Sequence, residues 1–155
     1  EFCELALLLY EKSTGKAAAP VFPNLFKDTA NPQILKAFAL GITQGTSATA
    51  FSPKSQITRE QCAAMLFRAI KAIAPGGDFS VAGVADFLDQ KSISVYAQEA
   101  TKYMSSLGII KGDKGYFMPK AATTAQQAAG YGAATREAAI LMSVRTSDKI
   151  DSIGK

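Results

Sequence analysis

Histidine is absent from the 155-residue sequence, and cysteine occurs only twice. Without imidazole, histidine-dependent catalytic triads and the commonest metal ligand are excluded. Cys3 and Cys62 each lie within an apolar helical pattern, which favours two buried, reduced thiols over a metal pair or a redox motif. A disulfide between the two cysteines stays open as an alternative. We expect neither a metal nor a cofactor.

Long apolar runs and dense charge are also missing. The longest apolar runs, such as LALLL at 5–9, are far shorter than the roughly 20 residues of a membrane-spanning helix. The net charge of +4 would favour an acidic partner, but the 17 basic residues are scattered and form no basic tract. With 48% hydrophobic and 19% charged residues, we expect a globular protein without membrane insertion and without a nucleic-acid partner.

The sequence contains an internal repeat, which is the primary clue to its organisation. Segment 25–70 aligns with segment 87–142, and the shared positions are Phe26/Phe87, Asp28/Asp89, Leu40-Gly41-Ile42/Leu107-Gly108-Ile109, Gly45/Gly112, Phe51/Phe117, Pro53/Pro119 and Thr58-Arg59-Glu60/Thr135-Arg136-Glu137. The second copy is longer, with an insertion around TTAQQAAGYGA before its second helix.

Residues 1–13 align with 61–73, so the chain opens on what reads as the last helix of a third, truncated copy. We therefore divide the chain into the tail of a first repeat at 1–20, a second repeat at 21–75 and a third repeat at 76–155.

Each copy has the signals of a helix, a loop and a second helix. Asn31 is suited to cap a helix that starts at Pro32 and ends before Gly41, and an equivalent helix is expected at about 94–106. Gly45 and Gly112 then permit tight turns in the following loops. These patterns predict an all-α fold of tandem helix-loop-helix units.

The second helix of each copy begins in an unusual way. Thr58 and Gln61 have the spacing of a capping box, yet Arg59 and Arg136 directly follow the threonine of each copy. A cation at this end opposes the helix dipole at a cost of about 0.3–1 kcal/mol. Two compensations remain open: an acidic partner within the chain, or an external anion bound by the guanidinium together with free backbone N–H groups of the helix start.

The fixed order of F-x-D, LGI-x-x-G, F-x-P and I-T-R-E resembles the S-layer homology (SLH) domain, from Glu1 to about Ser147. The resemblance implies a pseudo-threefold prism of tandem repeats. It also implies an extracellular module of a larger surface protein, held non-covalently at the cell wall or S-layer of a Gram-positive-type envelope. Its ligand would be a secondary cell-wall polysaccharide, often one with a pyruvate ketal on a sugar.

The resemblance further implies which residues contact that acidic sugar. The family motif is of the Thr-Arg-Ala-Glu type, and its arginine contacts the ligand together with the loop after the first helix. Carried over, the candidates are Thr58, Arg59 and Glu60, Thr135, Arg136 and Glu137, and the loop residues Gly45, Lys111 and Gly112. The third motif position is glutamate where the family often has alanine. The usual fourth-position acid is replaced by Gln61 and Ala138, while Glu1 matches it.

Two other classes of function compete with polysaccharide binding. One is an assembly module of a surface layer, in which protein carboxylates fill the same grooves. The other is an enzyme such as a wall hydrolase, which we do not expect because the sequence has no paired-carboxylate or nucleophile constellation beyond the motif acids. If Arg59 serves a ligand, its replacement by alanine should weaken binding and leave the melting temperature nearly unchanged.

Overall fold

The computed structural model describes residues 1–153, and within this range it consists of helices and loops. No β-strand occurs there, only isolated bridges. The predicted all-α class is therefore confirmed. The helices are α1 (Phe2–Thr14), α2 (Pro32–Ala39), α3 (Arg59–Ile73), the short 3-10 helices η1 (Gln90–Ser92) and η2 (Val95–Ala97), α4 (Gln98–Ser106), α5 (Thr124–Ala128) and α6 (Arg136–Ile153).

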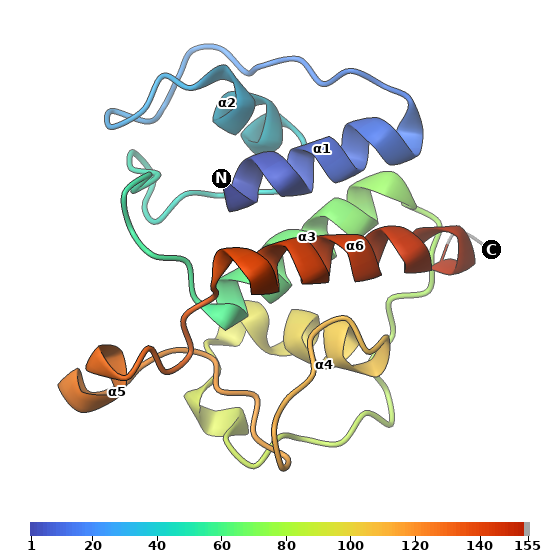
Figure 1. Ribbon diagram of the computed structural model, residues 1–155. Helices are drawn as coiled ribbons and strands as arrows, with labels where there is room; N and C mark the ends of the chain where they lie inside the picture. Colours follow the sequence, from blue (N-terminus) through green and yellow to red (C-terminus); the bar gives the residue numbers. More distant parts are fainter. Residues whose placement is uncertain (154–155) are drawn as a thin grey trace.

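Three helices, α1, α3 and α6, form the centre of the molecule, and each packs against the other two. Figure 1 shows α6 lying across α3 and beside α1. The helix α3 is deeply buried, because Cys62, Leu66 and Ile70 have no exposed surface. None of the described helices is long and apolar enough to cross a lipid bilayer. Helices α3 and α6 begin at the repeated Thr-Arg-Glu motif. The assignment of α1 to a truncated first copy and the pseudo-threefold prism remain predictions.

The first helix of each of the two repeats packs on the long helix that precedes it in the chain. Helix α2 packs against α1, and α4 packs against α3, where the rings of Phe67 and Tyr103 lie 4.8 Å apart. The repeat equivalent of Phe67 on α6 is Val144, which is 53% exposed, and its neighbours Ile140 and Leu141 are 56% and 48% exposed. This side of α6 therefore lacks the cover that α4 gives to α3.

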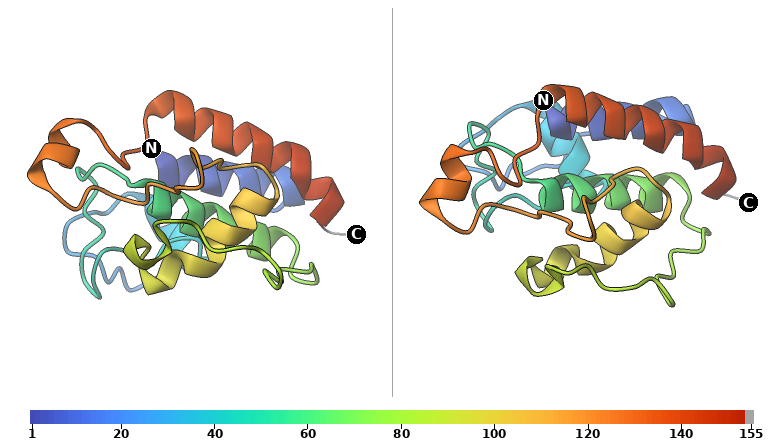
Figure 2. Two further views of the ribbon diagram at one scale, coloured as in Figure 1. Left: turned by 90° about the horizontal axis from the view of Figure 1, so that it is seen from below. Right: turned by 60° about the horizontal axis from the view of Figure 1, so that its bottom comes forward.

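The inserted segment of the last copy stands apart from the helical core. It contains α5, which projects from the body in every view of Figures 1 and 2. No residue of α5 is buried. Helix α5 therefore contributes no buried residue to the core, whereas the end of the insertion returns to α3 through the hydrogen bond from Arg59 N to Gly132 O.

Both cysteines are free and buried, with 4% of Cys3 and 0% of Cys62 exposed. Burial raises the pKa of each thiol to about 12, so both stay protonated at neutral pH. The predicted buried thiols are confirmed, and the alternative of a disulfide is wrong.

Local signals place the helix ends where the sequence predicts them. The side chain of Asn31 accepts a hydrogen bond from Gln33 N, and Gly41 leaves α2 with φ of 71°, so that Ile42 N bonds back to Ala37 O at 2.9 Å. At α3, Thr58 Oγ1 accepts from Gln61 N, and Gln61 Oε1 accepts from Thr58 N at 2.9 Å. This capping box fixes where α3 begins, and with it the place of Arg59.

We expect Thr58→Ala to lower the free energy of unfolding by about 1 kcal/mol, because the capping hydroxyl of α3 is lost. Thr58→Ser keeps the hydroxyl and should remain near the wild type. Urea unfolding followed by circular dichroism measures both variants. Equal stabilities of the alanine and serine variants would contradict the role of this cap.

Candidate functional site

The loop after the first helix is built in the same way in both copies. In the second copy, the carboxylate of Asp28 accepts hydrogen bonds from Phe51 N at 2.9 Å and Ser52 N at 2.7 Å. In the third copy, Asp89 accepts from Phe117 N and Met118 N, each at 2.8 Å. Each aspartate therefore fixes the loop of its own repeat through two backbone hydrogen bonds. The backbone N–H donors lower the pKa of Asp28 below its usual value.

The two predicted loop glycines are needed to close these loops. A Cβ on Gly45 would lie 2.6 Å from Ala50 O and 2.6 Å from the ring of Phe26, and Gly45 has a left-handed φ of 76°. A Cβ on Gly112 would collide with Tyr116 O, the repeat equivalent of Ala50 O. Gly45 and Gly112 therefore allow the loops to close because they have no Cβ.

Arg59 reaches from the start of α3 into the loop of the following copy. Its Nε donates to Phe117 O at 3.1 Å, its Nη2 donates to Lys111 O at 2.9 Å, and its guanidinium lies 5.3 Å from the centroid of the Phe117 ring. Within residues 1–153 no carboxylate lies within 4.0 Å of this guanidinium. Burial lowers the pKa of Arg59, although an arginine remains charged in any case. The side chain is thus a fixed cation without an acidic partner.

The start of α3 does not offer free backbone donors, which corrects one expectation from the sequence. Arg59 N donates to Gly132 O at 2.9 Å, and Glu60 N donates to Pro119 O at 3.2 Å. Gln61 N donates to the capping hydroxyl of Thr58 at 3.3 Å. The long connection before α6 folds back over this helix start and satisfies these groups. Anion recognition at Arg59 would therefore depend on the guanidinium alone.

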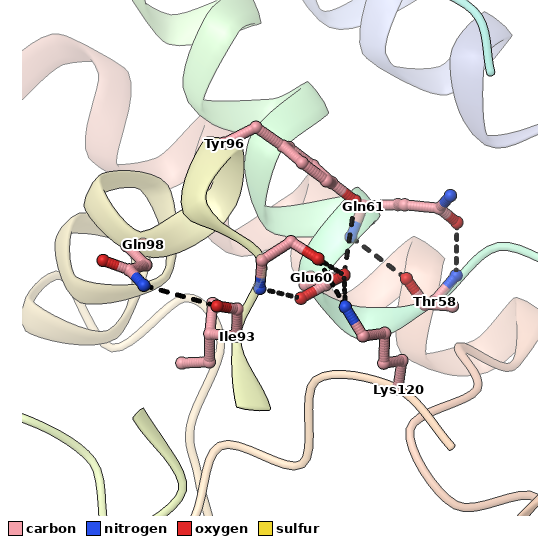
Figure 3. A network of polar contacts seen from close by, with 8 residues as sticks. Thr58, Glu60, Gln61, Ile93, Tyr96, Gln98 and Lys120 are labelled. Carbon is pink, nitrogen blue, oxygen red and sulfur yellow. Dashed lines mark hydrogen bonds and ion pairs between the residues drawn. The ribbon is translucent and has the colours of Figure 1, made fainter. Parts of the chain in front are cut away.

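Glu60, a predicted ligand residue, is only 2% exposed and lies in a polar network (Figure 3). Its carboxylate accepts hydrogen bonds from Ser94 N at 2.9 Å and Ser94 Oγ at 2.8 Å, and from Lys120 Nζ at 3.0 Å. Tyr96 OH also donates to it at 3.4 Å. The network joins the start of α3 to the segment before α4 and to the loop before α5, so the carboxylate is fully engaged within the chain.

Arg136, the repeat equivalent of Arg59, has a different partner. Its exposed guanidinium donates to both carboxylate oxygens of Glu1, through Nε at 3.1 Å and through Nη2. This hydrogen-bonded ion pair raises the pKa of Arg136 and lowers that of Glu1. Thr135 caps α6 by accepting from Ala138 N at 3.2 Å, and Glu137 is exposed. The acidic-partner explanation therefore holds for Arg136, whereas Arg59 is held by carbonyls.

A groove of about 1250 Å³ opens beside the starts of α1, α3 and α6 and the loop of the second copy. Of the predicted site residues, Gly45, Thr135 and Arg136 line it. Sequence reasoning missed Arg68 and Tyr96, which also line it. Arg68 is partly buried and donates from Nη2 to Gln44 Oε1 at 3.3 Å, and Tyr96 is 52% exposed.

Six of the nine predicted residues thus fall into two places, and the other three lie elsewhere. Arg59 lies with Lys111 and Gly112 at the junction of the second and third copies, where Lys111 is exposed. Gly45, Thr135 and Arg136 lie at the groove. Thr58 caps α3, and Glu60 lies in the buried polar network. Glu137 lies on the exposed surface of α6. In the described part of the chain, no group of three or more acidic or cysteine side chains is arranged to hold a metal ion.

Comparison with known proteins gives two kinds of match. The model of the S-layer homology domain matches residues 26–63 and 86–129. An endoglucanase from Bacillus sp. (strain KSM-635) is 36% identical over 109 residues, which are 67% of this chain and 11% of the endoglucanase. An amylopullulanase from Thermoanaerobacterium thermosulfurigenes is 33% identical over 94 residues, 60% of this chain and 5% of that protein. No solved structure matches significantly.

The braced loop gives a prediction about pH. In the folded state the pKa of Asp28 lies below its usual value of 3.8. The ionised carboxylate therefore stabilises the fold above pH 3.8, and this stabilisation is lost as the pH falls through the pKa of the folded state. A ¹³C NMR titration of the Asp28 carboxyl carbon should give a midpoint below 3.8. The Asp28→Asn variant should lose this part of the acid dependence of unfolding. A midpoint at or above 3.8 would show that the backbone donors do not hold the carboxylate.

The buried network gives a second prediction. Glu60→Ala leaves the ammonium of Lys120 and the N–H of Ser94 without their acceptor, and we expect a loss of about 1–3 kcal/mol in the free energy of unfolding. Glu137→Ala, the equivalent change at an exposed site, is the matched control and should leave the stability nearly unchanged. Urea unfolding compares the two variants, and similar losses would contradict the different placement of these glutamates.

Proposed function

Since the chain belongs to the S-layer homology domain family, whose members generally anchor surface proteins to the cell wall, we propose that it binds an acidic secondary cell-wall polysaccharide without a covalent bond. We further propose a pyruvylated sugar as the group recognised. The protein that carries this module would thereby be held extracellularly at the wall of a Gram-positive-type envelope. The family module itself binds and anchors rather than catalyses.

The observation that carries this proposal is the unpaired guanidinium of Arg59. A guanidinium has five N–H donors, and two of them are used by Phe117 O and Lys111 O, which leaves three for a ligand. The carbonyls and the Phe117 ring hold the group in place, so little rotamer freedom remains to be lost on binding. A partly buried cation without a carboxylate favours an incoming anion.

A pyruvate ketal matches this arrangement chemically. It presents a carboxylate fixed on a sugar ring, and a planar guanidinium binds a carboxylate through two parallel hydrogen bonds. Lys111 is exposed beside Arg59 and adds positive charge, while Gly112 leaves the loop without a side chain at that point. Arg136 could take part only after exchanging Glu1 for the ligand, which makes it the weaker candidate.

We expect Arg59→Gln to weaken binding of a pyruvylated wall polysaccharide about tenfold or more, because charged hydrogen bonds contribute about 1.5–3 kcal/mol. Isothermal titration calorimetry measures the dissociation constant. Lys149→Gln removes one exposed positive charge far from this junction and should bind like the wild type. Arg59→Lys keeps the positive charge but loses the paired N–H donors of the guanidinium. Its affinity should therefore lie between those of the wild type and Arg59→Gln.

Two further results decide the proposal. The wild type should not bind the same polysaccharide after its pyruvyl groups have been removed, and unchanged binding would contradict recognition of the ketal. Because Arg59 bonds to two carbonyls, Arg59→Gln should also lower the melting temperature somewhat, contrary to the expectation from sequence. Binding is therefore measured well below that temperature.

An assembly module is the second candidate, and the uncovered side of α6 favours it. Ile140, Leu141 and Val144 are about half exposed on adjacent turns, which is typical of a surface that contacts another protein. Sedimentation velocity of the wild type and of Val144→Asp tests this function. Association that the aspartate abolishes, in a chain that binds no polysaccharide, would favour assembly over anchoring.

A further inference from the structure

The outer side of α6 carries an apolar row that no described helix covers. Ile140, Leu141 and Val144 are about half exposed, and the exposed Asp148 follows Val144 by one helical turn. Residues three or four positions apart lie on one face of a helix, so these four side chains form one continuous surface, the α6 strip. In Figure 2, α6 lies along an edge of the molecule, and no other described helix lies beyond it.

The equivalent strip is covered on the two other central helices. In the repeat alignment, Val144 corresponds to Phe67 on α3 and to Leu7 on α1. Phe67 is 4% exposed, because α4 packs on α3 and brings Tyr103 against this ring. Leu7 is 2% exposed, on the helix against which α2 packs. One helix therefore fits onto each strip, and residues 1–153 leave the α6 strip open.

A charged residue at one end of each strip is matched by the helix that covers it. On α1 this residue is Glu11, whose carboxylate forms an ion pair at 3.6 Å with Lys36 of the covering helix α2. On α3 the aligned residue is Lys71, which pairs at 3.4 Å with Glu99 of the covering helix α4. The sign is reversed between the two pairs, and in each pair the covering helix carries the opposite charge.

On α6 the aligned residue is Asp148, which forms no ion pair with any residue of 1–153. Its carboxylate corresponds to that of Glu11, so the matching cover is a helix of the α2 kind, with an apolar side and a lysine. A helix of the α4 kind would bring a residue like Glu99 beside Asp148. Like charges at a contact disfavour such a partner.

A second copy of this chain matches the α6 strip less well. The exposed Glu137 precedes the apolar row, and Asp148 follows it. Two α6 helices packed antiparallel through their strips would bring Glu137 of one copy near Asp148 of the other, and a parallel arrangement would bring identical acids together. The helices α2 and α4 of a second copy are already packed on its own α1 and α3. The charges therefore favour a helix from a different protein.

We propose that the α6 strip docks one amphipathic helix of another protein. The apolar side of that helix covers Ile140, Leu141 and Val144, and a lysine or arginine at its edge pairs with Asp148. The apolar contact supplies most of the affinity, and the ion pair selects a basic helix over an acidic one. This inference rests on assembly, the second candidate function, for which it names the partner, and it does not depend on polysaccharide binding at Arg59.

The test uses the 155-residue chain and two synthetic peptides. The first peptide has the sequence of residues 29–44, which contain α2, and the second is the same peptide with Lys36→Glu. A hydrocarbon staple on the side away from the apolar row holds both peptides helical. ¹H–¹⁵N NMR titration locates and measures binding. We expect the first peptide to shift the signals of α6 and to bind about two- to fivefold more tightly than the second, as an exposed ion pair allows.

Variants of the chain test each part of the strip. We expect Val144→Asp to weaken binding of the first peptide about tenfold or more, because a carboxylate replaces the apolar contact. Asp148→Lys should weaken it about two- to fivefold, and should in turn bind the Lys36→Glu peptide more tightly than the wild-type chain does. Asp113→Lys makes the same change of charge in an exposed loop outside α6 and should bind like the wild type.

Every other outcome overturns the inference. Binding that leaves the α6 signals in place, or that the exchange of charges does not affect, would show that the strip does not select a basic helix. If neither peptide binds but the chain self-associates through Val144, a second copy covers the strip, so the assembly function stands and this partner is wrong. If neither peptide binds and the chain stays monomeric, the inference and the assembly function fail together. Thermal unfolding of each variant separates loss of binding from loss of fold.

Discussion

The contact between the guanidinium of Arg59 and the carbonyls of Lys111 and Phe117 is the constraint on which the functional arrangement depends. It joins the second helix of one repeat to the loop of the next repeat, across 52 and 58 positions of the chain. Backbone carbonyls hold the Arg59 guanidinium, whereas the Arg136 guanidinium forms an ion pair with the carboxylate of Glu1 on the exposed surface. Among residues 1–153, one arginine of the repeated motif therefore has no acidic partner, and its repeat equivalent has one.

The repeats share a loop framework and differ in how they are tied together. Asp28 and Asp89 each accept hydrogen bonds from two backbone N–H groups at equivalent positions of their loops. The buried carboxylate of Glu60, in contrast, accepts hydrogen bonds from Ser94, Tyr96 and Lys120. Its repeat equivalent, Glu137, is exposed. The same motif position thus supports the junction of two repeats in one copy and lies on the surface in the other.

Much of the fold could be predicted because its signals are local. The capping box at Thr58, the cap at Asn31 and the left-handed Gly41 fix helix ends from a few neighbouring residues, and the repeat showed which helices are equivalent. The partners of Arg59 and Glu60 could not be predicted, because they come from other repeats through tertiary packing. The hydrogen bond from Arg59 N to Gly132 O depends on the inserted segment, which has no repeat equivalent. The bond from Glu60 N to Pro119 O depends on tertiary packing between the two repeats. Sequence reasoning missed Arg68, because only the structure shows that this residue lines a groove.

The state of the Arg59 side chain in solution tests the central claim most directly. In ¹H–¹⁵N NMR spectra of the Arg59 Nε–H group, a guanidinium held by two carbonyls should give a separate signal whose hydrogen exchanges slowly with water. Addition of a pyruvylated wall polysaccharide fragment should shift this signal while the backbone amides of the helical core stay in place. A rapidly exchanging signal that coincides with those of exposed arginines, and that the fragment leaves unchanged, would contradict the account.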